Sequence, residues 1–202
     1  SDVSDIKQKE RQLAEANRNF GDSISYASSL QLGLLPSPEA LARHLGTTRT
    51  IWQPKDLVGG DFFWVGRIGH IDYLVFFDCT GHGVPGAFMT LIVTSVLDAI
   101  AVSAPAPPPA ARVLQLVHDG VCRQLGITPD TPGHDGLDCA VVRLNRGEDS
   151  LEFAGASIDL FEIAASGAVT RHRGARTTLG YRVHEAALSL TSVTLSIGQN
   201  GY

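Results

Sequence analysis

Apolar residues recur every seven positions in the first part of the chain. Ile6, Leu13 and Phe20 stand seven apart in an otherwise polar run, and steps of three and four continue the pattern beyond them. This spacing is typical of one narrow apolar stripe on an α-helix. We expect a helix over residues 1–35, because the sequence PSP follows at once. A narrow stripe on a long polar helix indicates a coiled-coil dimer or a signalling linker, with packing on its own domain as the alternative.

The pattern changes from residue 48 onward. Alternation of apolar and polar residues, and short apolar runs between turn sequences, predict strands. The expected strands cover residues 48–54, 61–68, 71–78, 137–145, 150–157, 158–165, 168–174, 187–190 and 192–198. Two helices are expected between them, an almost uniformly apolar one over 84–102 and an amphipathic one over 111–127.

This order of elements indicates an α+β layered fold, a β-sandwich flanked by helices. We therefore divide the chain into a linker helix over residues 1–37 and one domain over residues 38–202.

Composition excludes some classes of protein. A hydrophobic content of 44% is enough for a core, and a net charge of −5 with scattered basic residues argues against nucleic acid as a partner. Cys79, Cys122 and Cys139 form no pairing motif, which favours a reducing compartment and buried, unreactive thiols. No signal sequence is visible, and by our reading of the sequence no apolar run approaches the roughly 18 residues of a membrane span. We expect a cytoplasmic chain.

Two aspartates stand between glycine-rich turns and the most apolar segments. Asp61 follows Gly59 and Gly60, and Asp78 precedes the sequence CTGHGVPG. If the two strands that carry them form a hairpin, both carboxylates meet at one sheet edge. Mg²⁺ and Mn²⁺ prefer such sites of oxygen ligands. A simple turn or capping role for both aspartates is the alternative.

The same turn leads into the apolar helix at 84–102, whose N-terminus is able to bind an anion. A nucleotide-binding enzyme is therefore another interpretation. It lacks the P-loop lysine, and GHG alone is a weak signal.

Several motifs together resemble a known family. Within residues 26–181 the chain carries, in this order, YASSLQLGLLPS, QPKDLVGGDFFW, FFDCTGHGVPGAFMT, DGLDCAVVRLN, LEFAGASIDLFEI and TTLGY. In this order they resemble the SpoIIE-like branch of the PPM metal-dependent serine/threonine protein phosphatases. The resemblance implies a PPM-type β-sandwich with α-β-β-α layers and an N-terminal linker helix.

The resemblance also implies a binuclear Mn²⁺ or Mg²⁺ site. Asp61 and Asp78 match the bridging ligands, and Cys79 matches the residue whose backbone carbonyl binds metal. Two cations would lower the pKa of a bridging water, and the resulting hydroxide would attack phosphoserine or phosphothreonine. His82 is either a general acid for the leaving group or a structural turn residue, and Thr80 stands where eukaryotic relatives have a catalytic histidine.

Other polar residues allow two interpretations each. Asp135 and Asp138, in HDGLD, match a family pattern and either approach the substrate or metal or cap a tight turn. Arg171, Arg173 and Arg176 either hold a phosphate or a partner surface or form a solvated strand and turn.

The chain departs from the family near residues 190–192. The S-D-G and D-D-x-T motifs, which supply further metal ligands, have no counterpart, and Thr191 and Ser192 stand where the last acids would be. Either a segment is missing there from an otherwise competent enzyme, or the chain is a catalytically impaired binding module that recognises the phosphoprotein without turnover.

The resemblance implies partners as well. The expected substrate is a phosphorylated STAS-domain protein in a partner-switching pathway, opposed by a GHKL-type kinase. A second copy would dimerise through the N-terminal helix, and a membrane would be reached only through an upstream sensor.

Overall fold

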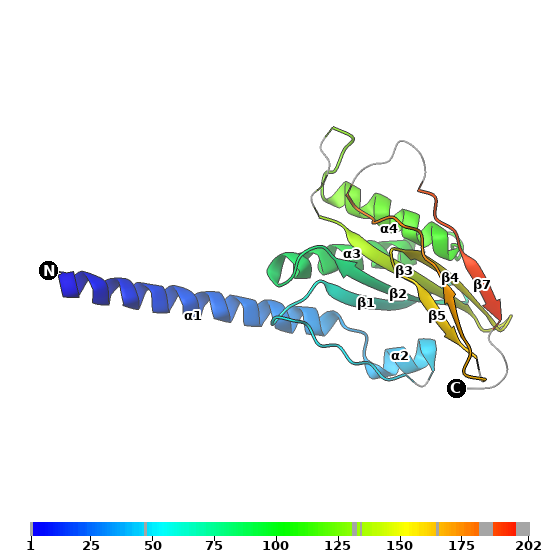
Figure 1. Ribbon diagram of the computed structural model, residues 1–202, viewed down its shortest axis with the longest axis horizontal. Helices are drawn as coiled ribbons and strands as arrows, with labels where there is room; N and C mark the ends of the chain where they lie inside the picture. The colour runs from blue at the N-terminus through cyan, green and yellow to red at the C-terminus, as the bar shows by residue number, and fades with distance from the viewer. Residues whose placement is uncertain are drawn as a thin grey trace.

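The computed structural model describes residues 2–46, 48–130, 133, 135–164, 166–181 and 188–196. Four helices and seven strands follow one another in this part of the chain (Figure 1). The helices are α1 (Asp2–Leu34), α2 (Pro38–Leu45), α3 (Val84–Ser103) and α4 (Ala110–Gln124). The strands are β1 (Asp61–Ile68), β2 (Ile71–Cys79), β3 (Leu137–Asn145), β4 (Ser150–Ala156), β5 (Leu160–Ile163), β6 (Val169–His172) and β7 (Val193–Ser196).

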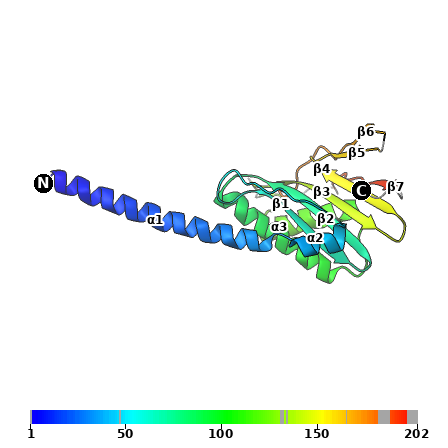
Figure 2. The ribbon, with the colours of Figure 1, turned by 90° about the horizontal axis from the view of Figure 1, so that it is seen from below.

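The central element is an antiparallel sheet in the order β1-β2-β3-β4-β7. Its strands alternate between two faces, as the period of two requires. One face packs on α3 and α4 through side chains such as Tyr73, Val75, Val93 and Leu114. The other face carries a smaller apolar cluster under the β5–β6 hairpin, which forms a separate two-stranded sheet (Figure 2). The predicted α+β layered fold is confirmed.

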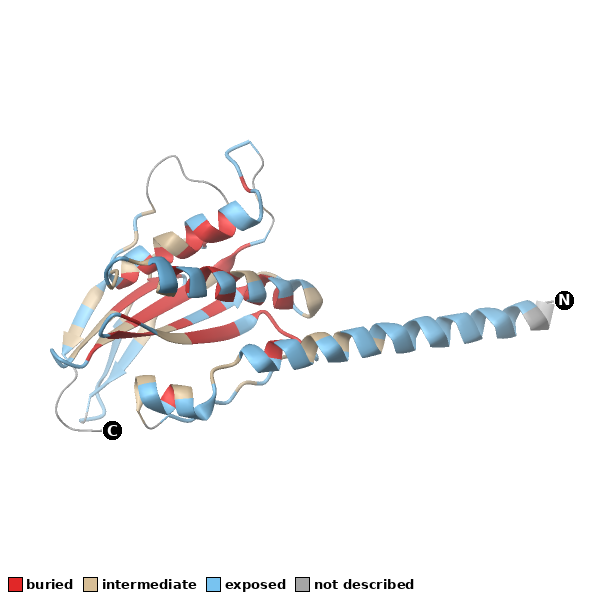
Figure 3. Cartoon of the chain, turned by 180° about the vertical axis from the view of Figure 1, so that it is seen from behind, coloured by how far each residue is buried: buried red, intermediate tan, exposed pale blue. Residues whose placement is uncertain are grey.

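The core lies between the sheet and the helix pair. Figure 3 shows the buried residues gathered on the sheet and on the inner faces of α3 and α4, while α1 is exposed over most of its length. Helix α3 corrects one sequence prediction, because its 20 residues have the length and composition of a possible membrane span. In this fold α3 is a core helix that packs on α4, β1 and β2.

The predicted strand over 48–54 is wrong. The segment has no strand pairing, and Ile51 within it is 93% exposed. Its alternating pattern comes from Trp52, which packs edge-on against Phe62 at 6.1 Å between ring centroids and donates a hydrogen bond to the Asp61 carbonyl oxygen at 3.0 Å. We therefore attribute the strand-like pattern to a single aromatic residue, Trp52, which packs on β1.

Helix α2 is absent from the sequence prediction, although its start signal is present. The Ser37 hydroxyl accepts a hydrogen bond from the Ala40 amide at 3.2 Å, and Pro38 occupies the first turn. Both features are typical of a helix N-terminus. The helix has only eight residues, so it shows little periodicity.

The end of the domain agrees with prediction only in part. β7 pairs antiparallel with β4 and confirms a strand within 192–198. Residues 188–190 form no strand, so the expected strand over 187–190 is wrong there, and residue 187 lies outside the described residues. The backbone instead turns locally, with the Leu190 amide donating to the Leu188 carbonyl at 2.8 Å.

Candidate active site

The strand register brings three aspartates into one row. In the β1–β2 hairpin Asp61 stands directly opposite Asp78, and in the β2–β3 pair Asp78 stands opposite Asp138. Directly opposed residues share a sheet face. The neighbouring residues Phe77 and Cys139 belong to the core on the α3–α4 side, so the three aspartates lie on the other face, at the end of three adjacent strands.

The row is electrostatically unbalanced. The pKa of Asp78 is raised by burial, then by the charge of Asp61 and the hydrogen bond between these two carboxyl groups, and by the charge of Asp138. The Oδ1 atom of Asp138 is buried and has no hydrogen-bond partner among the described residues. A buried carboxylate oxygen without a donor or cation is costly. This arrangement favours a site that receives positive charge from outside the chain.

Backbone oxygens lie beside the row. A Cβ atom at Gly60 would lie 2.6 Å from the Cys79 carbonyl oxygen and 2.8 Å from that of Gly81. The Cys79 amide in turn donates to the Gly60 carbonyl at 3.1 Å. Only glycine fits this approach, which places the peptide before Asp61 against the turn that follows Asp78.

The Cys79 thiol takes no part in this chemistry. It is buried, and burial, followed by the charges of Asp78 and Asp61, raises its pKa to about 12. A neutral thiol is a poor ligand, so only the carbonyl of Cys79 is suited to a hard cation. Burial likewise raises the pKa of Cys122 and that of Cys139, which agrees with the unreactive role expected for all three cysteines.

The available donors fit a partly hydrated divalent cation. Within the described ranges, no group of three or more His, Cys, Asp or Glu side chains is arranged to hold a metal ion by itself. Two coupled carboxyl groups, one unpartnered carboxylate oxygen and adjacent carbonyls are nevertheless the oxygen donors that Mg²⁺ and Mn²⁺ accept together with water. Asp61 and Asp78 are thus brought together as predicted, and Asp138 joins them.

Sequence reasoning missed the place of Asp138, which it assigned to a turn or to a looser role near the substrate. Cys139 is a small apolar residue at the start of a core strand, so alternation puts Asp138 on the opposite face. What brings Asp138 beside Asp78 is the pairing of β2 with β3, which are more than fifty residues apart in the chain. A local sequence pattern cannot predict such a pairing.

Thr80 and His82 occupy different surroundings in the turn after Asp78. The Thr80 hydroxyl lies 2.6 Å from the Tyr181 hydroxyl and accepts a hydrogen bond from the Gly136 amide at 3.2 Å. His82 is exposed, and its Nδ1 atom lies 3.0 Å from Asp56 Oδ2. Thr80 therefore fastens the turn to the domain, whereas His82 stands at its surface and its role as a general acid stays a prediction.

Comparison with known proteins shows what this chain is similar to. No sequence-family model matches the chain, and no curated protein sequence matches it. Among solved structures, the SiaA-PP2C domain of Pseudomonas aeruginosa is 28% identical, with a TM-score of 0.73 over 91% of this chain and 69% of that one. The fold and the sequence are thus similar to those of the SpoIIE-like branch of the PPM phosphatases.

More distant PPM structures share the fold. The RsbU and RsbW domains of a Mycobacterium tuberculosis protein match at 17% identity and a TM-score of 0.51, over 71% of this chain and 37% of that one. The PP2C phosphatase domain of SpoIIE from Bacillus subtilis, solved with a fragment of its regulatory domain, matches at 16% identity and a TM-score of 0.50, over 71% and 38%.

The remaining predicted residues are not part of the aspartate row. Asp135 is exposed in the segment before β3. Arg171 on β6 donates to Asp159 Oδ2 at 2.6 Å, and its guanidinium stands 5.7 Å from the Phe161 ring. Arg173 and Arg176 are exposed after the same strand. Arg171 thus braces the β5–β6 hairpin, which favours the structural interpretation for it.

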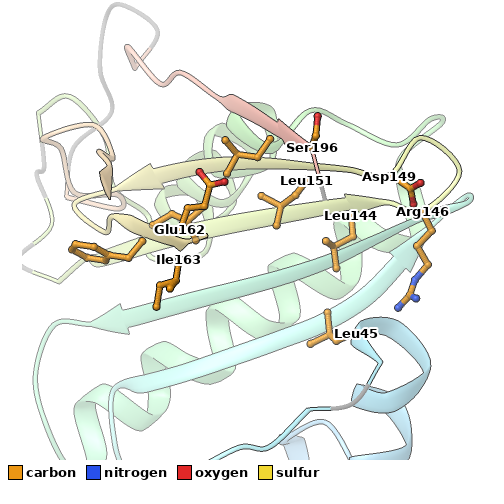
Figure 4. A pocket seen from close by; sticks show the side chains of 11 residues that line it. Leu45, Leu144, Arg146, Asp149, Leu151, Glu162, Ile163 and Ser196 are labelled. Atoms are coloured by element: carbon orange, nitrogen blue, oxygen red, sulfur yellow. The ribbon is translucent and has the colours of Figure 1, made fainter. Parts of the chain in front are cut away.

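A pocket of about 620 Å³ lies on the same side of the domain as the β5–β6 hairpin (Figure 4). Its walls are mostly apolar, with charged groups at the rim, and they include none of the three aspartates. The lining residues are Leu45, Leu144, Arg146, Asp149, Leu151, Leu160, Phe161, Glu162, Ile163, Leu195 and Ser196.

Proposed function

We propose that the chain is a metal-dependent protein serine/threonine phosphatase. The single observation that carries the proposal is the register of Asp61, Asp78 and Asp138 across three neighbouring strands. Similarity to solved PP2C-type phosphatase domains supports phosphatase activity in general. The metal dependence and the specificity for phosphoserine or phosphothreonine are parts of the proposal.

In the proposed site, Asp61 and Asp78 hold Mn²⁺ or Mg²⁺ through their carboxylates, and Cys79 does so through its backbone carbonyl. Bound divalent cations supply an acidified water at neutral pH and neutralise the charge of the phosphate. Asp78 is suited to this role because the like charges beside it make its own negative charge unfavourable without a cation. Thr80 and Tyr181 keep the turn in place through their hydroxyl contact.

The proposed substrate is a phosphorylated STAS-domain protein of a partner-switching pathway, and the resemblance of the sequence to the SpoIIE-like branch supports it. Helix α1 is proposed to join two copies and to connect them to an upstream, membrane-bound sensor, with this chain in the cytoplasm. Its apolar residues support a second copy as the partner: Ile6, Leu13 and Phe20 are 55%, 63% and 65% exposed, and α1 extends away from the domain (Figure 1).

Hydrolysis of para-nitrophenyl phosphate and of a phospho-STAS protein, each with added Mn²⁺, tests the proposal. We expect turnover by the native chain, loss of turnover with EDTA, and loss in Asp61→Ala and Asp78→Ala. Asp119→Ala, which removes an exposed aspartate from α4, is the matched control and should retain activity.

Two results would contradict the proposal. Turnover that survives Asp78→Ala would refute the metal assignment. Tight binding of the phospho-STAS protein without turnover at any Mn²⁺ concentration would instead support the binding module.

A further inference from the structure

Helix α1 buries a polar residue and exposes its apolar ones. Among residues 5–34, whose exposure the structure describes, Gln31 alone is buried, with 2% of its surface exposed. Glutamine is rarely buried without a specific reason, because its amide needs partners for two N–H groups and an oxygen. The one fully buried side chain among these residues of α1 is therefore polar, and its contacts are directional.

The amide of Gln31 is bonded on both sides. Its Nε2 atom donates to the Gly59 carbonyl at 2.7 Å, and its Oε1 atom accepts from the Gly59 amide at 3.0 Å. Nε2 also donates to the Thr90 hydroxyl at 2.9 Å, and that hydroxyl donates to the Ala87 carbonyl at 2.7 Å. Because the Thr90 hydroxyl has used its proton, it can only accept from Gln31, and this fixes the orientation of the amide.

The bonded backbone N–H and C=O both belong to Gly59, two residues before Asp61. Gly59 is followed by Gly60, which packs directly against the Cys79 and Gly81 carbonyls. Thr90 lies one turn along α3 from Gly86, where an added Cβ would lie 2.4 Å from the Gly81 carbonyl oxygen and 2.9 Å from Gly60 Cα. Gln31 thus joins α1 both to the segment before Asp61, through Gly59, and to α3, through Thr90. Both segments pack against the turn that follows Asp78.

We propose that Gln31 is a positioning residue for the metal site. By holding both polar groups of Gly59 it fixes the peptide that leads into Asp61, and so sets the affinity of the site for a divalent cation. This inference rests on the proposed function, and it adds a determinant of the site that lies outside the aspartate row and on the linker helix.

A purely structural role makes a different prediction. If Gln31 only attaches α1 to the domain, its loss lowers the stability of the metal-free chain and leaves the metal affinity unchanged. If it positions the Asp61 peptide, its loss weakens the metal site in the folded chain. Groups that orient metal ligands typically change metal affinity by about 10–100-fold.

The test is calorimetric titration of Mn²⁺ into the full chain, with the native protein beside Gln31→Leu, Gln31→Glu and Thr90→Val. We expect the Mn²⁺ dissociation constant to rise by about tenfold or more in both Gln31 variants, and by less in Thr90→Val, which keeps both bonds to Gly59. Gln12→Leu, on the exposed part of the same helix, is the matched control and should bind as the native chain does.

Phosphatase assays over a range of Mn²⁺ concentrations give the second measurement. The Gln31 variants should need more Mn²⁺ for half-maximal rate and should approach the native kcat at saturating Mn²⁺. If neither Gln31 variant folds, Thr90→Val still tests the inference, because it removes the bond that fixes the orientation of the Gln31 amide. Native Mn²⁺ affinity in folded Thr90→Val would then contradict the inference.

The outcomes separate the two proposals. Folded Gln31→Leu that binds Mn²⁺ as tightly as the native chain, while Asp78→Ala does not bind it, overturns the role of Gln31 alone. A native chain that binds no Mn²⁺ overturns the proposed function and this inference with it.

Discussion

The β1–β2 hairpin carries an aspartate near each end, Asp72 buried and Asp78 exposed, and the two have opposite surroundings. Asp72, near the turn, is 1% exposed and faces two arginines and a histidine. His44 Nδ1 and Arg67 Nε each lie 2.7 Å from its Oδ1, and Arg146 Nε lies 3.5 Å from its Oδ2. Asp78, near the open end, faces Asp61 and Asp138.

The two carboxyl groups titrate in opposite directions as a result. Burial opposes ionisation of Asp72, but hydrogen bonds from Arg67 and His44 and their charges outweigh it, so its pKa lies below the ordinary value. The pKa of Asp78 lies above the ordinary value, because burial and its acidic neighbours act together. The chain balances one of these charges itself and leaves the other for a ligand, which distinguishes a structural carboxylate from a binding one.

Replacing the unbalanced carboxylate should produce the largest change. In Asp78→Asn we expect kcat/KM to fall by about a thousandfold, because the cations supply several kcal/mol of charge stabilisation to the reaction. The melting temperature of the metal-free chain should stay unchanged or rise, since a like-charge contact is removed. Kinetics with saturating Mn²⁺ and thermal melts in EDTA measure the two effects, and a destabilised but active variant would contradict the comparison.

The equivalent change at the balanced carboxylate should affect stability instead. Asp72→Asn leaves His44, Arg67 and Arg146 without their anion, and we expect a loss of about 2–3 kcal/mol in the free energy of unfolding. Urea denaturation measures it. Arg146→Ala, which removes the longest of the three contacts, should cost less than about 1 kcal/mol because that side chain is more than half exposed.

Lowering the pH should change the stability contributions of Asp72 and Asp78 differently, and the direction is clearer for Asp72. Its folded pKa lies below the unfolded value of about 3.9, so its contribution is complete above pH 5 and is lost as the pH falls from about 4 through the folded pKa. The difference in unfolding free energy between the native chain and Asp72→Asn should therefore shrink below pH 4. A difference that stays constant from pH 6 to pH 3 would show that Asp72 is not ionised in the fold.

Local pattern predicted most elements of this fold. The strands at 61–68 and 137–145 have the predicted bounds, because alternation and turn sequences define both ends. The strand at 48–54 fails because one aromatic contact of Trp52 imitates alternation. α2 was not predicted, because eight residues are too few to show a helical period.

The site divides in the same way. The motif around Asp61 and Asp78 is local, so a hairpin between adjacent strands was enough to predict their meeting. Asp138 and Gln31 are distant in sequence from the residues that they face, and their roles depend on the β2–β3 pairing and on the seat of α1 beside Gly59. Neither contact leaves a periodic trace in the chain.

The smallest expected change concerns His82, which stands outside both charge clusters. Its pairing with Asp56 is exposed on both sides, with 74% and 48% of the side chains accessible, and such ion pairs contribute little to stability. We expect His82→Gln to alter the free energy of unfolding by less than about 0.5 kcal/mol and kcat by less than about tenfold, because Nδ1 is directed to a surface carboxylate rather than to the aspartate row. A loss of about 10²–10⁴ in kcat, with the alkaline limb of the pH–rate profile removed, would instead assign His82 as the general acid. In that case Asp56 would have a third role, different from those of Asp72 and Asp78, because it would orient a catalytic imidazole near the metal-binding end of the hairpin.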